Sequence, residues 1–199
     1  MQEEFEPISL EPQSAKNRKL TVAVIIVLLV IILAITCALL IKHYVVSTFI
    51  VDGISMYPTL DGGNGPDGDE DRTNGDVIYL NKVAKIKRGD IVVFNVDDAA
   101  IAERSLVKRV IAVAGDHIQI IKNQVFINDE LLDEPYINEP MHNAEGYILD
   151  MVIEDGYIFC MGDNRNNSMD SRIFGAVSLN DVVGKCFLIK SKSGKLHFI

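Results

Sequence analysis

The sequence has no tryptophan, only three cysteines, and fewer basic than acidic residues among its 199 positions. Lys and Arg sum to 19 against 28 Asp and Glu, which gives a net charge of −9. This shortage of cations argues against a nucleic-acid partner, because such proteins displace phosphate counterions with a basic surface. Three cysteines are too few for a small protein that is held together by disulfides, and their spacing fits no zinc site. We therefore expect no metal and no cofactor.

One long apolar run, Leu20 to Ile41, contains 22 residues and no charge. As a helix rising about 1.5 Å per residue it would span roughly 33 Å, enough to cross a bilayer. A cleavable signal peptide would have an apolar core of only about 7–15 residues, followed by a small-x-small site. The run is too long and no such site follows it, so the sequence predicts an uncleaved anchor.

The cations that flank the run predict its orientation. Three precede it and one follows it: Lys16, Arg18 and Lys19, then Lys42. The excess on the N-terminal side predicts a single-pass protein of the cell membrane, with a cytoplasmic tail at 1–19, the anchor at 20–41 and an extracytoplasmic domain at 42–199. The first 41 residues carry four Glu against three cations, so −8 of the net charge lies in the exterior domain.

Short β-type runs, without a long helical period, fill the exterior domain. The candidate strands are Tyr44–Val51, Val77–Asn81, Asp90–Val96, Leu106–Ala114, His117–Ile121, Gln124–Ile127, Tyr157–Met161 and Val182–Lys190. Turn residues at Gly115-Asp116 and Lys122-Asn123 predict two hairpins. Many short strands with turn signals predict an all-β sandwich or barrel.

The segment 61–76 differs from the rest of the domain, because it has five Gly, many acidic residues and no aliphatic side chain. Such a composition cannot bury a core, so it predicts a mobile loop. Acidic residues that alternate with Gly also suit a calcium loop, although their register does not match an EF-hand.

Ser55 follows the first candidate strand, between Gly53 and Pro58. Pro58 turns the chain there, and Gly53 permits a close approach by another backbone. Such a serine is usually a turn residue, and it needs a base to act as a nucleophile. None of the four His lies in a triad motif.

Lys108 is the best candidate base, because it lies inside an apolar strand. With period-two alternation it shares a face with Leu106, Val110 and Ala112, while Arg109 points to the other face. Apolar surroundings disfavour the charged amine, and lowering its pKa to about 8 would leave about a tenth of it neutral at pH 7. The alternative is a lysine whose stem packs while its ammonium reaches water.

A third cluster of polar residues, 162–172, follows the apolar strand Tyr157–Met161. Its two acids, two arginines and two serines within ten residues suit either a hydrogen-bonded scaffold beside a site or a solvated turn.

Taken in order, Ser55 to Leu60, Lys108-Arg109 before Gly115-Asp116, and Gly162-Asp163-Asn164-Arg165 through Arg172 resemble the bacterial type I signal peptidases. The resemblance covers nearly the whole exterior domain and includes the anchor. It implies a membrane serine endopeptidase with a mostly β, antiparallel sheet domain on one N-terminal transmembrane helix. Its expected partners are secretory preproteins, cleaved at the signal peptide, and the lipid bilayer.

The resemblance also implies a role for each site residue. Ser55 is the nucleophile, with its backbone N–H in the oxyanion hole, and Lys108 is the general base. Ser168 orients that lysine. Two ion pairs complete the expected site, Arg109 with Asp163 and Asp170 with Arg172.

Two departures from the family pattern concern the surroundings of the pair. Gly53 stands where some members have a serine that donates to the oxyanion, and Asn166 replaces an Asp of the third motif.

Three other hypotheses compete with this one. The first is an anchored protein that only binds a partner through its β domain. The second is a self-cleaving repressor, for which the 19-residue tail and the anchor leave no DNA-binding module. The third is a thiol enzyme centred on Cys160, which lies in an apolar run more typical of a buried core residue.

Overall fold

The computed structural model describes residues 13–63, 75–96, 104–142 and 148–199. Contacts divide the chain into two units at the boundary between Tyr44 and Val45. Most of the acidic segment 61–76, including the candidate calcium loop, lies outside the described residues.

The first unit contains one long helix, α1 (Gln13–Tyr44). Its residues Asn17–Tyr44 are apolar enough and long enough to cross a membrane, and their side chains are exposed. The predicted helix is confirmed, and it extends beyond the apolar run at both ends. Tyr44 was expected to begin a strand, which is wrong: the helix continues through it, and the first strand starts two residues later.

The second unit is built on a sheet of eight strands. Its members are β1 (Val46–Ile50), β2 (Val77–Asn81), β3 (Ile91–Val96), β4 (Arg104–Val113), β9 (Tyr157–Met161), β10 (Val177–Ser178), β11 (Val182–Lys190) and β12 (Leu196–Phe198). The order is β1-β2-β11-β3-β4-β9-β10, and β12 pairs with β11. Strand β3, central in this order, is buried at five of its six positions, which explains its continuous apolar sequence.

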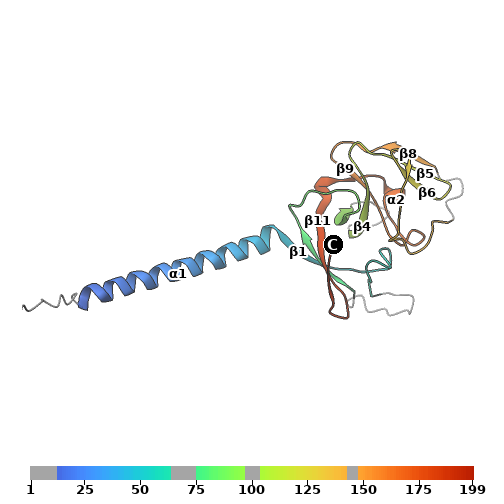
Figure 1. Ribbon diagram of the computed structural model, residues 1–199. Helices are drawn as coiled ribbons and strands as arrows, with labels where there is room; N and C mark the ends of the chain where they lie inside the picture. Colours follow the sequence, from blue (N-terminus) through green and yellow to red (C-terminus); the bar gives the residue numbers. More distant parts are fainter. Residues whose placement is uncertain (1–12, 64–74, 97–103, 143–147) are drawn as a thin grey trace, which may run out of the picture. The chain divides into compact units, whose positions relative to one another are not determined.

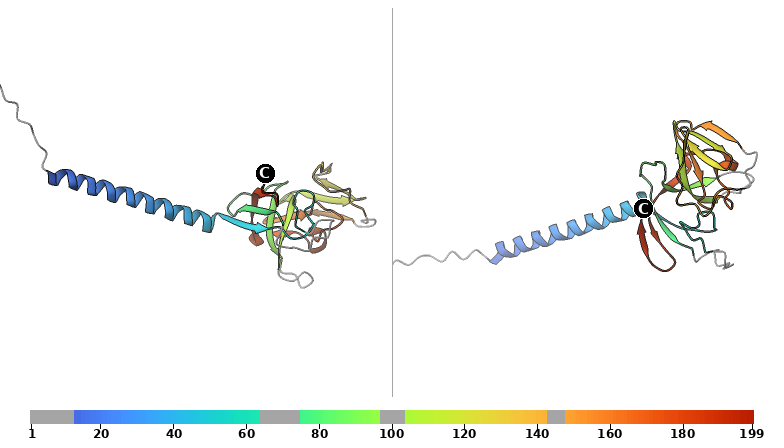
Figure 2. Two further views of the ribbon diagram at one scale, coloured as in Figure 1. Left: turned by 90° about the horizontal axis from the view of Figure 1, so that it is seen from below. Right: turned by 45° about the vertical axis from the view of Figure 1, so that its right-hand side comes forward.

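A second sheet of four strands lies at one end of the β unit in every view (Figures 1 and 2). It contains β5 (His117–Ile121), β6 (Gln124–Ile127), β7 (Glu130–Leu131) and β8 (Leu149–Val152), in the order β7-β6-β5-β8. All strand pairs among the described residues are antiparallel, so the predicted fold class is confirmed. Two short helical turns, α2 (Ser171–Phe174) and η1 (Leu179–Asp181), lie between β9 and β11.

Only one of the two predicted hairpins forms. Lys122 and Asn123 both have positive φ and join β5 to its partner β6. Gly115-Asp116 also makes a turn, but it joins β4 of the large sheet to β5 of the small sheet, and these two strands do not pair. The turn residues thus indicate where the chain bends, but not which strands it brings together.

Strand β4 contributes to three core clusters, which fixes the position of Lys108. Val107 packs in the first cluster, Val110 in the third, and Ala112 in the second, between the two sheets. The pairing of β4 with β9 shifts its register between Val110 and Ala112. The predicted face shared with Lys108 therefore ends at Val110, because a bulge breaks the simple alternation.

Candidate active site

The loop after β1 holds Ser55 between buried neighbours. Val51, Met56 and Leu60 are fully buried and pack in the first core cluster. The Leu60 N–H donates to the Met56 carbonyl oxygen at 2.9 Å, which closes a turn just after the serine. Ser55 itself is half-buried, so a fixed backbone presents its hydroxyl next to β4.

Lys108 on β4 reaches this hydroxyl directly. Its Nζ donates to Ser55 Oγ at 2.6 Å and to the Val107 carbonyl oxygen at 2.9 Å. The side chain does not reach water, because Lys108 is only 2% exposed. The structure thus excludes the alternative of an ammonium that reaches solvent, and it brings together the two residues expected to react.

Burial lowers the pKa of Lys108 from its ordinary value to about 8. Removal from water disfavours the ammonium form and is the largest cause. The negative charges of Asp170 and Asp163 act in the opposite direction, and the positive charge of Arg172 adds to the lowering. At pH 7 about a tenth of the amine is then neutral and able to accept a proton.

Asp163 is completely buried and is bound by residues from two other segments. Arg109 donates to its two carboxylate oxygens from Nε at 2.8 Å and from Nη2 at 2.6 Å. Thr59, in the loop that holds the serine, donates to the same carboxylate at 2.5 Å. A paired carboxylate of this kind connects the loop, β4 and the third motif, and buried charges are tolerated only when paired in this way.

Asp170 forms a second buried centre of hydrogen bonds. Arg172 donates to it from Nε and Nη2, each at 2.8 Å, and the Gly162 N–H donates at 2.9 Å. Burial opposes ionisation of the carboxyl, but Arg172 and the Gly162 N–H outweigh it and lower the pKa of Asp170. The third motif is therefore a buried scaffold and not a solvated turn.

This scaffold touches the backbone of the serine directly. The Asn164 N–H donates to the Ser55 carbonyl oxygen at 3.0 Å, and the Asn164 side chain donates to the Ile54 carbonyl oxygen at 3.1 Å. A Cβ atom on Gly162 would lie 2.5 Å from the Ser55 carbonyl oxygen, so only glycine fits there. The tight contact explains why glycine begins the motif.

The remaining predicted residues lie beside the pair without bonding to Lys108. Ser168 Oγ is buried and interacts with the Asp170 carboxylate, which contributes to the lowered pKa of Asp170. Gly53 adopts φ of +85°, and its N–H donates to the Gly62 carbonyl oxygen at 3.4 Å. In the described part of the chain the Ser55 N–H has no acceptor, so it is available to an oxyanion.

Sequence reasoning missed two side chains that support this site, Glu134 and Tyr136. Glu134 binds the almost completely buried Arg165, with Nη1 at 2.8 Å and Nη2 at 2.5 Å, and the Arg109 guanidinium lies 4.0 Å from the centre of the Tyr136 ring. Arg165 belongs to the third motif, and a buried arginine needs an acidic partner. This requirement was the one signal in the sequence that pointed to a missing acid. Nothing in the sequence pattern identified Glu134 as that acid.

Cys160 is fully buried in β9. Burial raises the pKa of its thiol far above the ordinary value, which keeps it protonated and unreactive. The structure therefore contradicts the hypothesis of a thiol enzyme centred on Cys160.

An antiparallel β unit that buries a lysine against a serine hydroxyl defines a serine hydrolase with lysine as its candidate base. The chain belongs to the signal peptidase family, peptidase S26, whose family model matches residues 22–190. It is thus a serine endopeptidase of the kind that removes signal peptides, as the sequence resemblance predicted.

Curated relatives from bacilli are similar over most of the chain. Signal peptidase I S of Bacillus subtilis (strain 168) is 36% identical over 154 residues, which cover 71% of this chain and 74% of the relative. Signal peptidase I T of the same strain is 36% identical over 166 residues, covering 77% and 78%. A signal peptidase I of Bacillus amyloliquefaciens is 35% identical over 162 residues, with the same coverage. Together with the apolar helix, these relatives indicate association with a membrane.

Proposed function

We propose that Ser55 and Lys108 together cleave the peptide bond that joins a signal peptide to a secretory preprotein. The observation that carries this assignment is the 2.6 Å contact between Lys108 Nζ and Ser55 Oγ, made by a lysine with 2% exposure. A neutral amine at this distance from a hydroxyl is placed to act as a general base.

In the first half of the reaction, neutral Lys108 accepts the proton of the Ser55 hydroxyl while Oγ attacks the carbonyl carbon of the scissile bond. The Ser55 N–H, which has no acceptor among the described residues, donates to the oxyanion of the tetrahedral intermediate. The ammonium of Lys108 then gives its proton to the leaving amine as the C–N bond breaks. An acyl-enzyme ester on Ser55 remains, and Lys108 is neutral again.

In the second half, Lys108 accepts a proton from a water molecule that attacks the ester carbonyl. The intermediate collapses, and the proton returns to Ser55 Oγ as the ester bond breaks. The signal peptide leaves with a new carboxyl group. Among the groups of the enzyme, only the serine and the lysine gain or lose a proton or a bond in the reaction.

The other predicted residues hold this pair in position. Arg109 and Thr59 hold Asp163 and so fix the third motif against the serine loop, while the Asp170–Arg172 ion pair stabilises the motif itself. Ser168 is proposed to orient the amine of Lys108, since its buried hydroxyl interacts with the Asp170 carboxylate beside that lysine. Gly53 supplies no side chain, so the oxyanion hole depends on backbone donors.

The chain is proposed to place residues 1–19 in the cytoplasm, 20–41 in the membrane and 42–199 outside, following the cations near the apolar run. The 14 residues that follow Ile41 end at Ser55. Fully extended they reach about 50 Å at most, so the nucleophile stays near the bilayer. This position suits translocated precursors that are still held in the membrane by an apolar segment.

The full chain, reconstituted in lipid vesicles and incubated with a purified secretory preprotein, tests the proposal. Mass spectrometry of the products should show one cut at the end of the signal peptide with the wild type and none with Ser55→Ala. If the wild type binds the precursor and leaves it intact, the chain is a binding protein and the proposal is wrong.

A further inference from the structure

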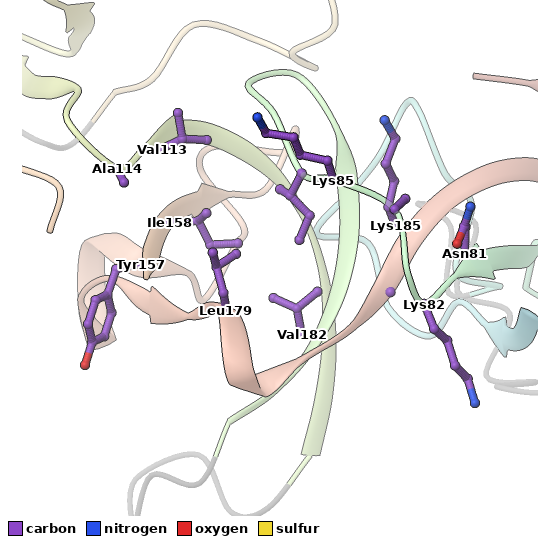
Figure 3. Close-up of a pocket in the computed structure, with 13 residues that line it drawn as sticks. Asn81, Lys82, Lys85, Val113, Ala114, Tyr157, Ile158, Leu179, Val182 and Lys185 are labelled. Atoms are coloured by element: carbon purple, nitrogen blue, oxygen red, sulfur yellow. The ribbon is translucent and has the colours of Figure 1, made fainter. Parts of the chain in front are cut away.

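A second site lies in the β unit, apart from the serine loop. It is a cavity of about 550 Å³ between the end of β2, the segment 82–86, the start of β9 and β11. Much of its wall is apolar: Figure 3 shows Val113, Ile158, Leu179 and Val182, and Ile86 also lines it. We call this cavity the β2–β9 groove; the proposed peptidase mechanism leaves it unused.

The rim of the β2–β9 groove is basic, although the exterior domain as a whole is acidic. The lining of the groove contains three cations and no acid, namely Lys82, Lys85 and Lys185, and the Lys82 side chain points away from the other two in Figure 3. In Figure 3 the ammonium groups of Lys85 and Lys185 lie on the same side, beyond the apolar side chains. Lys185 is paired with Asp90 at 2.9 Å, whereas Lys85 has no ion-pair partner among the described residues.

Two residues that line the groove are bonded to the segment that directly follows the apolar helix. Strand β2 ends at Asn81, which pairs with Val46, and the Lys82 N–H donates to the Val45 carbonyl oxygen at 2.8 Å. Val45 is the residue that directly follows helix α1. Lys82, which lines the groove, is therefore hydrogen-bonded to the residue at which the chain enters the domain from the apolar helix.

We infer that the β2–β9 groove binds one anionic phospholipid of the bilayer in which the helix is anchored. One of its two acyl chains would lie along the apolar wall, and the phosphate would lie against the rim at Lys85. An unpaired lysine beside unfilled apolar volume complements a ligand that is anionic at one end and apolar at the other. A precursor peptide fits less well, because no residue of the serine loop lines the groove.

The absence of tryptophan gives a direct test with the full chain in vesicles. Leu179 is 41% exposed and Tyr157 is 39% exposed, so Leu179→Trp and Tyr157→Trp each place one fluorophore in the groove with little disturbance. Phe198→Trp, at a position 79% exposed on β12, is the control outside the groove. The probes are phosphatidylglycerol and phosphatidylcholine with brominated acyl chains, which quench tryptophan only on contact.

Brominated phosphatidylglycerol should quench both groove reporters more strongly than brominated phosphatidylcholine, and it should not do so for Phe198→Trp. Adding Lys85→Glu should weaken this preference by about fivefold or more, as expected for one cation near an anionic headgroup. The matched charge control, Lys195→Glu on the turn before β12, should leave the preference unchanged.

Three results would overturn the inference. The first is equal quenching by the two lipids, and the second is loss of quenching when millimolar inorganic phosphate competes, which would indicate a site for the free anion alone. The third is displacement of the quencher by a signal peptide, which would assign the groove to polypeptide. None of these readouts uses peptidase activity, so failure here is separable from failure of the proposed mechanism.

Discussion

Lys108 Nζ lies 2.6 Å from Ser55 Oγ, although 53 residues separate the two in the sequence. The two residues meet because β4 is an interior strand of the large sheet and because the serine loop is fixed by Val51, Met56 and Leu60 in the core. The same packing that brings the atoms together excludes water from the amine and lowers its pKa. Position and reactivity of the lysine thus have a single cause.

Removing the amine of Lys108 tests its role as the base. Lys108→Met keeps the length and burial of the side chain, so the fold should persist while proton transfer is lost. Single-turnover cleavage of a preprotein should slow by about 10²–10⁴-fold or more. Lys195→Met, an exposed lysine far along the chain, is the control and should cleave like the wild type. A Lys108→Met rate within tenfold of the wild type would remove the lysine from the mechanism.

Arg109 should matter more for stability than surface arginines do. Arg109→Met leaves the completely buried Asp163 without its main partner. An uncompensated buried charge of this kind costs about 3–5 kcal/mol of unfolding free energy. Urea denaturation of the variant should show this loss, and the double variant with Asp163→Asn should recover part of it. A change below about 1 kcal/mol would show that the pair is screened like a surface salt bridge.

Gly162→Ala tests whether the third motif needs glycine at this position because the motif lies so close to the serine loop. The new methyl group would lie 2.5 Å from the Ser55 carbonyl oxygen and would push the serine away from Lys108. Overpacking should cost about 1–3 kcal/mol of stability, and the displaced serine should lower the cleavage rate by about 100-fold. Gly194→Ala, in an exposed turn at φ of +84°, is the control that adds strain without a clash. Equal activity of the two variants would contradict the packing argument.

Cys160 should be dispensable for catalysis. Cys160→Ser puts a hydroxyl in a fully buried position, which costs about 1–3 kcal/mol of stability, but it should leave processing largely unchanged. Iodoacetamide should likewise fail to inactivate the native wild type, because the thiol is buried and protonated. Rapid inactivation that Cys160→Ser prevents would restore the thiol hypothesis.

The sequence predicted the helix and eight of the strands, because each has a long apolar run or a clear alternation of its own. The strands β7 and β10 were not predicted, because two residues are too few to show an alternation of apolar and polar side chains. Strands β8 and β12 carry few buried residues at the edges of their sheets, and so lack an alternation strong enough to detect. The division into two sheets was not predicted from the sequence either. The turn at Gly115 indicates that the chain bends there, but not which strands pair on either side of it.

The site was predicted mainly by motifs in a fixed order, and in part by the apolar strand around Lys108. The apolar neighbours of Lys108 in the sequence indicate that its amine can be neutral. They do not show that the amine reaches Ser55, because the spacing of residues fixes neighbours only within one strand. Glu134 and Tyr136 were missed for the same reason. Their partners, Arg165 and Arg109, come from distant segments that only the folded chain brings together.

The pH dependence of kcat/KM for preprotein cleavage tests the central claim most directly. Protonated Lys108 cannot accept a proton from Ser55, so activity should fall tenfold per pH unit on the acid side of the lysine pKa and level off above it. With the pKa of Lys108 at about 8, the midpoint of the rise should lie near pH 8. A flat profile from pH 5 to pH 9, or a midpoint near the ordinary lysine value of about 10.4, would contradict a sheltered neutral amine.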